Sequence, residues 1–389
     1  MTTYRGHVEA RGKGTYRGFI ELGFDADGKR KRTTFTLRGN KREAEAELTK
    51  RLHELNTGTY VSPSKLTVGQ WLEQWLRDYA ERRVQPSTFE RYAQIVRQHL
   101  IPALGHYQLR KLHGMHIQAY YVEAQSSGNQ RREGGLSARS VLHHHRVLNQ
   151  ALGQALKLGL LAANPADAAE PPRVQGREMD ALDESESARL LSVAQNSRLY
   201  LPILIALTTG MRRGEICGLQ WSDVDLVEGC ITVRRSLEQT KDGLRLKTPK
   251  TNKARRITLP ALAVKTLKAH KAEQAALRLK LGAAYKDQGL VVCREDGEFT
   301  KPDTLSSLFR SMAKKHGFAV SFHGLRHSHA SQLLKKHVPV HVVSQRLGHA
   351  SPAITLNVYS HVLPGMQEEA AQLLDEALGQ ALEKQAVAT

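Results

Sequence analysis

The chain has 389 residues, of which 40% are apolar and 24% charged, so it is too apolar for a disordered polymer and too long for one ordinary core. A net charge of +19 and a pI of about 9.9 favour a polyanionic partner, although a surface kept basic only for solubility would look the same. The three cysteines are scattered, which argues against a disulfide framework. The first residues contain no apolar segment of a signal peptide, and no apolar run is long enough to span a bilayer. These features predict a cytoplasmic protein.

The first 60 residues predict a small β-rich domain. A strand is expected over 16–22, a turn over 25–28, a returning strand over 30–37, and a helix over 41–55 whose apolar residues recur at helical spacing. Cations cluster on this hairpin, at Arg17, Lys29, Arg30, Lys31 and Arg32. A two-stranded ribbon is narrow enough for a DNA major groove, so these residues are candidate DNA contacts, against the alternative of a solvated charged hairpin.

The next hundred residues predict an all-helical domain over 66–165, after a linker at 61–65. Helices are expected from Pro86 to about His99, near 116–124, and over 137–158, with a loop over 126–135. Gly159 should end the last helix, and Asn164-Pro165 should close the domain. Residues 166–176 predict a second linker that is extended by composition.

The last part of the chain, residues 179–389, predicts a mixed α+β domain. Helices are expected over 185–194 and 199–208, and strands over 230–237 and 254–259 form a small antiparallel sheet. The expected fold is therefore multidomain and mainly α-helical with small antiparallel sheets. Its three domains are 1–60, 66–165 and 179–389.

The same part of the chain carries residues that suit attack on a phosphodiester. Such a reaction needs a nucleophile and cations for the negative charge that develops on the phosphorus oxygens. Arg212 and Arg326 supply guanidinium groups, which bind phosphate through two parallel hydrogen bonds. No carboxylate cluster or His/Cys spacing predicts a metal site, and adjacent residues such as His143, His144 and His145 point apart on a helix. His327 and His329 also lack metal-ligand spacing and are not among the candidates.

Taken together, these motifs resemble the tyrosine recombinase, or phage integrase, family. The resemblance rests on Thr209-Gly210-Met211-Arg212 with Glu215, on His323-x-x-Arg326, on Gly348-His349, and on Tyr359 ten residues later. It covers 180–362, and the two N-terminal domains are similar to the arm-binding and core-binding (SAM-like) domains of lambda-type members. Each residue alone has an ordinary structural explanation, whereas the ordered set is specific.

The resemblance implies a role for each residue. Tyr359 would be the nucleophile that forms a 3′-phosphotyrosine and frees a 5′-hydroxyl. Arg212 and Arg326 would bind the phosphate, His349 would hold it, and His323 would act as general base or hydrogen-bond donor. Glu215 would orient the arginine or histidine side chains around it.

The family's lysine, which protonates the leaving oxygen from the turn of a β-hairpin, falls in the string 247–255. Lys250 is the preferred residue, and Lys247 and Lys253 remain open. A free tyrosine has a pKa near ~10, and nearby cations would lower it while an imidazole accepts the proton. The phosphotyrosine keeps the energy of the broken bond, so no ATP, metal or other cofactor is expected. Ser351-Pro352 should start the helix that carries Tyr359, and Gly348 should end the helix before it.

The expected function is site-specific cleavage and rejoining of double-stranded DNA at attachment sites, in the integration or excision of a phage or integrative element. By analogy, a homotetramer would act on two duplexes, and DNA-bending or directionality proteins would assist it. The amphipathic tail over 367–385 would dock on a neighbouring protomer or fold onto its own domain. A type IB topoisomerase-like enzyme and a catalytically silent DNA-binding regulator are the alternatives, and the arm-like domain and the complete residue set argue against them.

Overall fold

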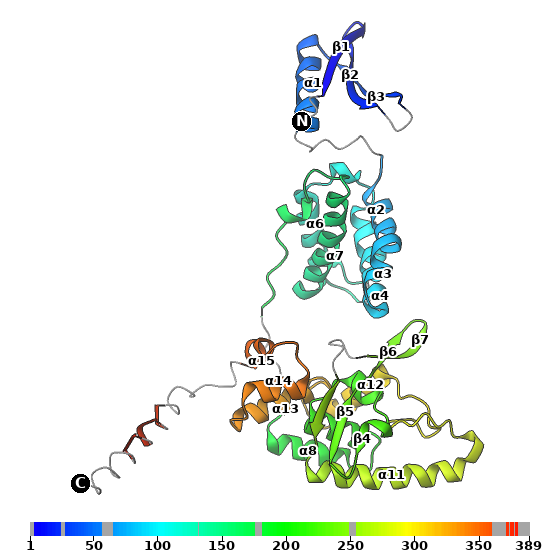
Figure 1. Cartoon of the computed structure of the whole chain (residues 1–389), viewed down its shortest axis with the longest axis vertical. Helices are drawn as coiled ribbons and strands as arrows, with labels where there is room; N and C mark the ends of the chain where they lie inside the picture. Colours follow the sequence, from blue (N-terminus) through cyan, green and yellow to red (C-terminus); the bar gives the residue numbers. More distant parts are fainter. Residues whose placement is uncertain are drawn as a thin grey trace. The chain divides into compact units, whose positions relative to one another are not determined.

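The computed structural model describes residues 4–24, 28–56, 65–130, 132–175, 181–248 and 254–359, and residues 371, 372, 374–376, 378 and 379 farther on. The chain divides into two compact units, Met1–Gly176 and Arg177–Thr389. The described residues are mainly helical and include three small antiparallel sheets (Figure 1). This confirms the predicted fold class.

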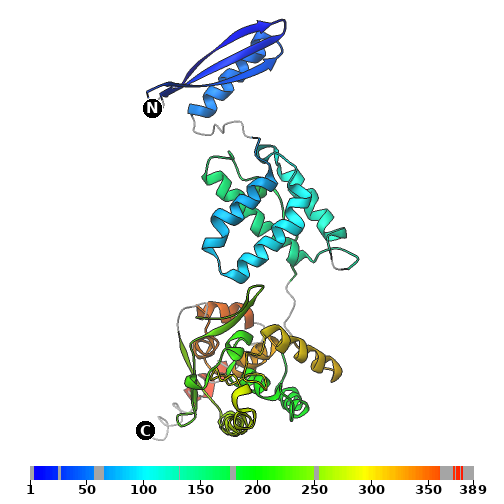
Figure 2. The same cartoon turned by 90° about the vertical axis from the view of Figure 1, so that its right-hand side faces the viewer.

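The N-terminal sheet has three strands rather than the predicted two. Its strands run in the order β1-β2-β3, with β1 over Arg5–Gly12, β2 over Thr15–Phe24 and β3 over Arg30–Arg38. Helix α1, Lys41–Asn56, lies along one face of this sheet in both views (Figures 1 and 2). The small core between them contains Ile20, Phe35 and Leu48. Because β1 is rich in charged residues and glycine, it has no apolar alternation that would predict a strand.

The helical part of the first unit contains two long helices that are each interrupted by a π-helical turn, and two α-helices without such a turn. The first interrupted helix comprises α2 (Val68–Trp75), a π-helical turn (Leu76–Ala80) and α3 (Glu81–Arg83). The second comprises α4 (Pro86–Ile95), a π-helical turn (Val96–Leu100) and α5 (Ile101–Leu104). The uninterrupted helices are α6 (Gly114–Ser127) and α7 (Ala138–Lys157). Thr67 begins α2 with a reciprocal capping box, and Trp71 donates from its buried indole to the carbonyl of Ala151. Figure 2 shows these helices gathered into one bundle.

The predicted linker over 166–176 begins later than expected. Residues Pro165–Ala168 form a short 3-10 turn. Ala166 and Ala169 are buried in the core of the helical bundle, and the backbone of Glu170 donates to Gln118. Small apolar side chains against the bundle therefore fix a segment that its composition alone predicted as extended.

The second unit contains eight helices among its described residues up to Tyr359. They are α8 (Glu184–Ala194), α9 (Tyr200–Thr209), α10 (Arg213–Cys217), α11 (Ala261–Leu281), α12 (Pro302–Lys315), α13 (Gly324–Lys335), α14 (Val340–Leu347) and α15 (Pro352–Tyr359). Helix α9 is buried along nearly its whole length, and α8, α11 and α13 pack against it. Pro352 lies at the first turn of the helix that carries Tyr359, and Gly348 ends the helix before it, as predicted.

Two small sheets complete this unit. Strands β4 (Val224–Asp225), β5 (Cys230–Val233) and β8 (Arg255–Thr258) form one, and the hairpin of β6 (Ser236–Thr240) and β7 (Gly243–Lys247) forms the other. The single strand predicted over 230–237 is wrong, because the chain leaves the first sheet after Val233 and enters the second at Ser236. The two adjacent arginines between these strands interrupt the alternation that a continuous strand would need.

None of the helices described here combines the length and the apolar character needed to cross a membrane. Most of the tail helix predicted over 367–385 lies outside the described residues.

Candidate active site

Arg212 is positioned by a glycine that ends the preceding helix. Gly210 has a left-handed backbone, with φ of 66°, and turns the chain from α9 into α10. A Cβ at this glycine would lie 2.7 Å from both His329 and Leu347, so the close packing also requires glycine. Arg212 follows as the N-cap residue of α10, with its side chain 35% exposed.

A buried carboxylate holds Arg212 and a second arginine. Glu215 is 2% exposed and accepts hydrogen bonds from the Arg212 backbone at 2.8 Å and from its Nη1 at 3.0 Å. The same carboxylate accepts from Nη1 and Nη2 of Arg255, at 3.0 and 2.6 Å. Burial alone would raise the pKa of Glu215, but the hydrogen bond from Arg255 and the two positive charges outweigh it and lower that pKa. The Glu215 carboxylate therefore holds the guanidinium groups of Arg212 and Arg255 side by side.

Three arginines converge on the carboxyl end of α14. Arg255 Nε donates to the carbonyl of Arg346 at 2.8 Å, Arg326 Nη2 to that of Leu347 at 2.7 Å, and Arg212 Nη2 to that of Gly348 at 3.3 Å. Because the last carbonyls of a helix lack intrahelical partners and carry partial negative charge, cations stabilise this end. Side chains from β8, α13 and the start of α10 thus meet just before His349.

Arg326 is the most buried of these cations. It is 3% exposed, and its Nη1 also donates to the carbonyl of Gly210 at 2.6 Å. Burial and the nearby charge of Arg212 lower the pKa of Arg326 to about 9, so it is charged at neutral pH. Two of its five N–H donors bond to carbonyls, which leaves donors for a phosphate.

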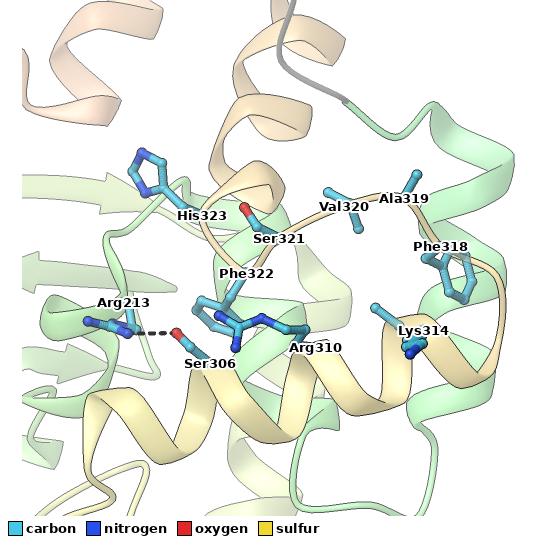
Figure 3. Close-up of a pocket in the computed structure, with 11 residues that line it drawn as sticks. Arg213, Ser306, Arg310, Lys314, Phe318, Ala319, Val320, Ser321, Phe322 and His323 are labelled. Atoms are coloured by element: carbon cyan, nitrogen blue, oxygen red, sulfur yellow. Dashed lines mark hydrogen bonds between the residues drawn. The ribbon is translucent and has the colours of Figure 1, made fainter. Parts of the chain in front are cut away.

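His323 lies at one end of a basic cavity of about 880 Å³ (Figure 3). Arg310 and Lys314 of α12 line this cavity, and Arg213 donates to Ser306 of the same helix at 2.7 Å. His323 is exposed on one side. Desolvation by the protein around it and the charges of Arg326 and Arg212 lower its pKa. The cations that line this cavity suit a polyanion.

His349 is half-buried and fixed by a buried hydroxyl. Its Nδ1 lies 2.8 Å from Thr355 Oγ1, and Thr355 has no exposed surface. Burial and the charges of Arg326 and Arg212 lower the pKa of His349 to about 4, so its ring is neutral at physiological pH. When the Thr355 hydroxyl donates to Nδ1, the proton is on Nε2, where it can donate to a ligand.

Tyr359 lies at the end of α15 and is 3% exposed, packed with Ala330, Leu334 and Leu347. Burial raises the pKa of its hydroxyl to about 12, and the positive charge of Arg326 offsets this only in part. The expected lowering by a nearby cation is present, but the net direction is opposite to the prediction, because desolvation penalises a buried phenolate more than one charged neighbour stabilises it.

The sequence analysis missed two residues of this cluster. His327 Nδ1 lies 2.6 Å from the Tyr359 hydroxyl, and Arg255 forms the ion pair with Glu215. The sequence analysis excludes His327 from the candidate residues because it lacks metal-ligand spacing. Its position four residues after His323 was nevertheless a usable signal, because residues i and i+4 share one face of a helix.

Two of the three candidate lysines, Lys250 and Lys253, lie outside the described residues. Lys247 ends β7, and its ammonium lies 2.5 Å from the carboxylate of Glu238, which is 6% exposed. An ammonium held by a buried carboxylate is poorly placed to reach a leaving group.

The cations predicted to contact DNA from the N-terminal hairpin lie on β2, on β3 and just before β3. Arg17 donates to Thr34 at 3.4 Å and lies over the ring of Phe19, 5.3 Å from its centre. Arg30 and Arg32 are exposed, and strand alternation places them on the same face as Arg17, opposite α1. Lys29 and Lys31 are exposed as well.

Among the residues described, no group of three or more His, Cys, Asp or Glu side chains could hold a metal ion. His144 and His145 instead form separate hydrogen bonds to the hydroxyls of Tyr120 and Tyr121, at 2.6 and 2.7 Å.

Comparison with known proteins links this geometry to one family. Residues 180–366 match the model of the phage integrase family, and 67–124 match the phage integrase N-terminal SAM-like domain. A tyrosine recombinase XerC-like protein of Caldanaerobacter subterraneus subsp. tengcongensis is 28% identical over 390 residues, covering 94% of this chain and 97% of that protein.

Solved structures share the fold. The Tn1549 transposon integrase in complex with a circular intermediate DNA has a TM-score of 0.67 at 19% identity, covering 79% of this chain and 99% of its own. A lambda integrase tetramer bound to a Holliday junction has a TM-score of 0.57 at 20% identity, covering 89% and 96%. The second match extends the likeness over more of this chain than the first.

Proposed function

The chain belongs to the phage integrase family of tyrosine recombinases, and from that premise we propose that Tyr359 is the nucleophile with which it cuts DNA. As a family member it is an enzyme that cleaves and rejoins DNA in the site-specific recombination of a phage or integrative element. What supports the residue assignment is the convergence of Arg212 and Arg326 on consecutive carbonyls, Gly348 and Leu347, beside His349.

In the proposed reaction the Tyr359 oxygen attacks the scissile phosphorus in line with the leaving 5′-oxygen. The P–O5′ bond breaks, and the products are a 3′-phosphotyrosine and a 5′-hydroxyl. Arg212 and Arg326 bind the non-bridging oxygens and hold the charge that develops on them. His349 donates from Nε2 to the same phosphate, and His323 acts as hydrogen-bond donor or general base. The reverse reaction with another 5′-hydroxyl rejoins the strand without ATP or metal.

Lys250 remains the proposed general acid for the leaving oxygen, with Lys253 as the alternative. The pairing of Lys247 with Glu238 makes that residue the weakest of the three. A substrate with sulfur in place of the 5′-oxygen tests this, because a thiolate leaves without a proton at neutral pH. Lys250→Ala should cleave the sulfur substrate as fast as the wild type and the normal substrate slowly, whereas Arg326→Ala should be slow on both.

Trapping the covalent complex on nicked suicide DNA tests the nucleophile. Wild-type protein should form an adduct that a protease removes, and mapping should find the modified tyrosine at 359. Tyr359→Phe should bind the same DNA and form no adduct. A protease-sensitive adduct in that variant would disprove the assignment.

We also propose three functional domains: residues 1–60 bind arm-type sites, 66–165 bind the core site, and 179–389 catalyse. Arg17, Arg30 and Arg32, on the face of the N-terminal sheet opposite α1, would supply the arm contacts together with Lys29 and Lys31. The enzyme would act as a homotetramer on two duplexes, as the lambda integrase tetramer does on a Holliday junction. Its tail over 367–385 would dock on a neighbouring protomer. Helper proteins that bend DNA or set direction complete this proposal.

A further inference from the structure

The hydroxyl of Tyr359 is held by His327. Its oxygen lies 2.6 Å from Nδ1, and the two rings are 5.7 Å apart between their centres. His327 begins the second turn of α13, one residue after Arg326. The contact therefore joins α13, which carries Arg326 and follows His323, to α15, the helix that carries Tyr359.

The burial of both groups decides which of them donates the hydrogen bond. Burial, followed by the charges of His323, Arg326 and His349, lowers the pKa of His327 to about 4. Because burial also raises the pKa of Tyr359, both groups are neutral at pH 7. Tyr359 then donates and Nδ1 accepts, while the imidazole proton is on Nε2. The histidine lone pair is aimed at the proton that the nucleophile has to lose.

Building on the proposed role of Tyr359, we propose that His327 is a catalytic residue that takes the phenolic proton through Nδ1 as the Tyr359 oxygen attacks phosphorus. The O–H bond of Tyr359 breaks as the O–P bond forms, and imidazole becomes imidazolium. The P–O5′ bond breaks, and the leaving oxygen takes a proton from an ammonium group, proposed as Lys250, or from water. Proton and charge therefore balance within the site.

The neighbouring side chains are less suited to this step. Arg326 has only N–H donors and accepts no proton near neutral pH. The ring of His323 packs edge-on against His327, with centres 4.9 Å apart, and lines the basic cavity. His349 uses its Nδ1 for Thr355. Among the described residues, His327 is the one imidazole with a hydrogen bond to the nucleophile.

The wide difference between the two pKa values explains why the proton stays on Tyr359 until DNA arrives. A bound phosphodiester adds negative charge beside His327 and raises its affinity for a proton. The phenol becomes more acidic as its oxygen bonds to phosphorus. Transfer is then coupled to attack, so an enzyme without DNA keeps a neutral, unreactive tyrosine.

Two substitutions separate proton acceptance from positioning. His327→Asn places an amide oxygen near the position of Nδ1, so it still accepts a hydrogen bond from Tyr359 but takes no proton. His327→Ala removes both functions. His341→Ala is the matched control, since His341 is an exposed histidine on α14. Each full-length variant is compared in single-turnover cleavage of nicked suicide DNA between pH 6 and 9, with DNA binding and thermal unfolding measured in parallel.

We expect both His327 variants to bind DNA like the wild type and to cleave about 100-fold more slowly at pH 7, at the lower end of general-base effects. Their rates should rise with pH up to about tenfold per unit, because hydroxide replaces the missing base, whereas the wild-type rate changes less. Both should remain slow on the substrate with a 5′-sulfur, because the defect concerns the nucleophile and not the leaving group. His341→Ala should match the wild type throughout.

Near-normal cleavage by His327→Asn with a wild-type pH profile would overturn the proposal and reduce His327 to a positioning residue. Faster cleavage by His327→Ala would overturn it too, since His327 would then restrain Tyr359. Either result leaves Tyr359 as the nucleophile. That assignment fails separately, if Tyr359→Phe still forms the covalent adduct.

Discussion

Replacing Glu215 with alanine removes the carboxylate on which two arginines depend. The side chain accepts four N–H groups, two from Arg212 and two from Arg255, at distances from 2.6 to 3.0 Å. Arg255 has 10% of its side chain exposed and Arg212 has 35%. The substitution therefore leaves one cation buried without its partner and another partly solvated.

The loss of stability follows from these exposures. Removing one partner of a buried ion pair lowers the free energy of unfolding by about 3–5 kcal/mol, and a pair with a partly exposed partner contributes less. We assign most of the effect to Arg255 and expect Glu215→Ala to lower the free energy of unfolding by about 3 kcal/mol. Glu215→Gln keeps the shape but turns an NH2 group toward N–H donors, so we expect a loss of about 2 kcal/mol.

Urea unfolding of the full chain, monitored by hydrogen–deuterium exchange in peptides of α9, measures this loss of stability in the unit Arg177–Thr389 alone. The control is Glu228→Ala, which removes the exposed partner of Arg256 at 3.9 Å and should change stability by less than about 0.5 kcal/mol. A double-mutant cycle with Arg255→Ala isolates the pair. If Glu215→Ala falls within the range of the control, the buried carboxylate does not hold the site together.

The same pair predicts a dependence on pH with a definite sign. The pKa of Glu215 is lowered in the folded state, so its stabilising effect is fully present above the unfolded pKa of about 4.3 and is lost as pH falls through the folded pKa. The stability difference between wild type and Glu215→Gln should therefore stay constant from pH 8 to about 5 and shrink at lower pH. A difference that shrinks toward high pH would contradict this origin.

Other substitutions test the remaining parts of the site. Arg212→Ala and Arg326→Ala should each lower single-turnover cleavage by about 10²–10³ while gel-shift affinity falls far less, and equal losses would make them backbone anchors only. Gly348→Ala should unfold at lower temperature and cleave slowly, because φ of 65° strains alanine and its Cβ would lie 3.0 Å from an arginine side chain; an unchanged melting curve would refute this. Arg310→Ala and Lys314→Ala should each reduce the salt dependence of DNA binding by about one phosphate contact, and an unchanged slope would remove the cavity from the DNA path.

The residues that the sequence predicted for the candidate site are those that recur as an ordered motif. Arg212, Arg326 and Tyr359 come from separate helices, yet each has a specific local context that a reader of the sequence recognises. Arg255 had no such context, because its role depends on facing Glu215 across the fold from strand β8. His327 lies on the helix face of His323, and this position was a usable signal, but the sequence analysis considered this histidine only as a metal ligand.

The pKa of a site residue was harder to predict from the sequence than its identity. The prediction of a lower pKa for Tyr359 considered its charged neighbours, whereas burial against residues such as Leu334 and Leu347 raises that pKa. Burial depends on how α13, α14 and α15 pack, which no local pattern encodes. The strand predicted over 230–237 failed for a related reason, since its partners on two different sheets decide where it divides.

In the proposed mechanism, the carbonyl contacts of the arginines would couple phosphate binding to the placement of Tyr359. Arg212 and Arg326 bind the carbonyls that immediately precede His349, and ten residues later the same segment ends at Tyr359. Each guanidinium has donors left for phosphate oxygens, so a bound phosphate and the end of α14 share the same two cations. If a phosphate displaces either guanidinium, the carbonyls should move with that guanidinium, or the hydrogen bonds between them should weaken. The position of the Tyr359 oxygen, and its contact with His327, would then depend on the phosphate being in place, which would restrict attack to a correctly bound DNA strand.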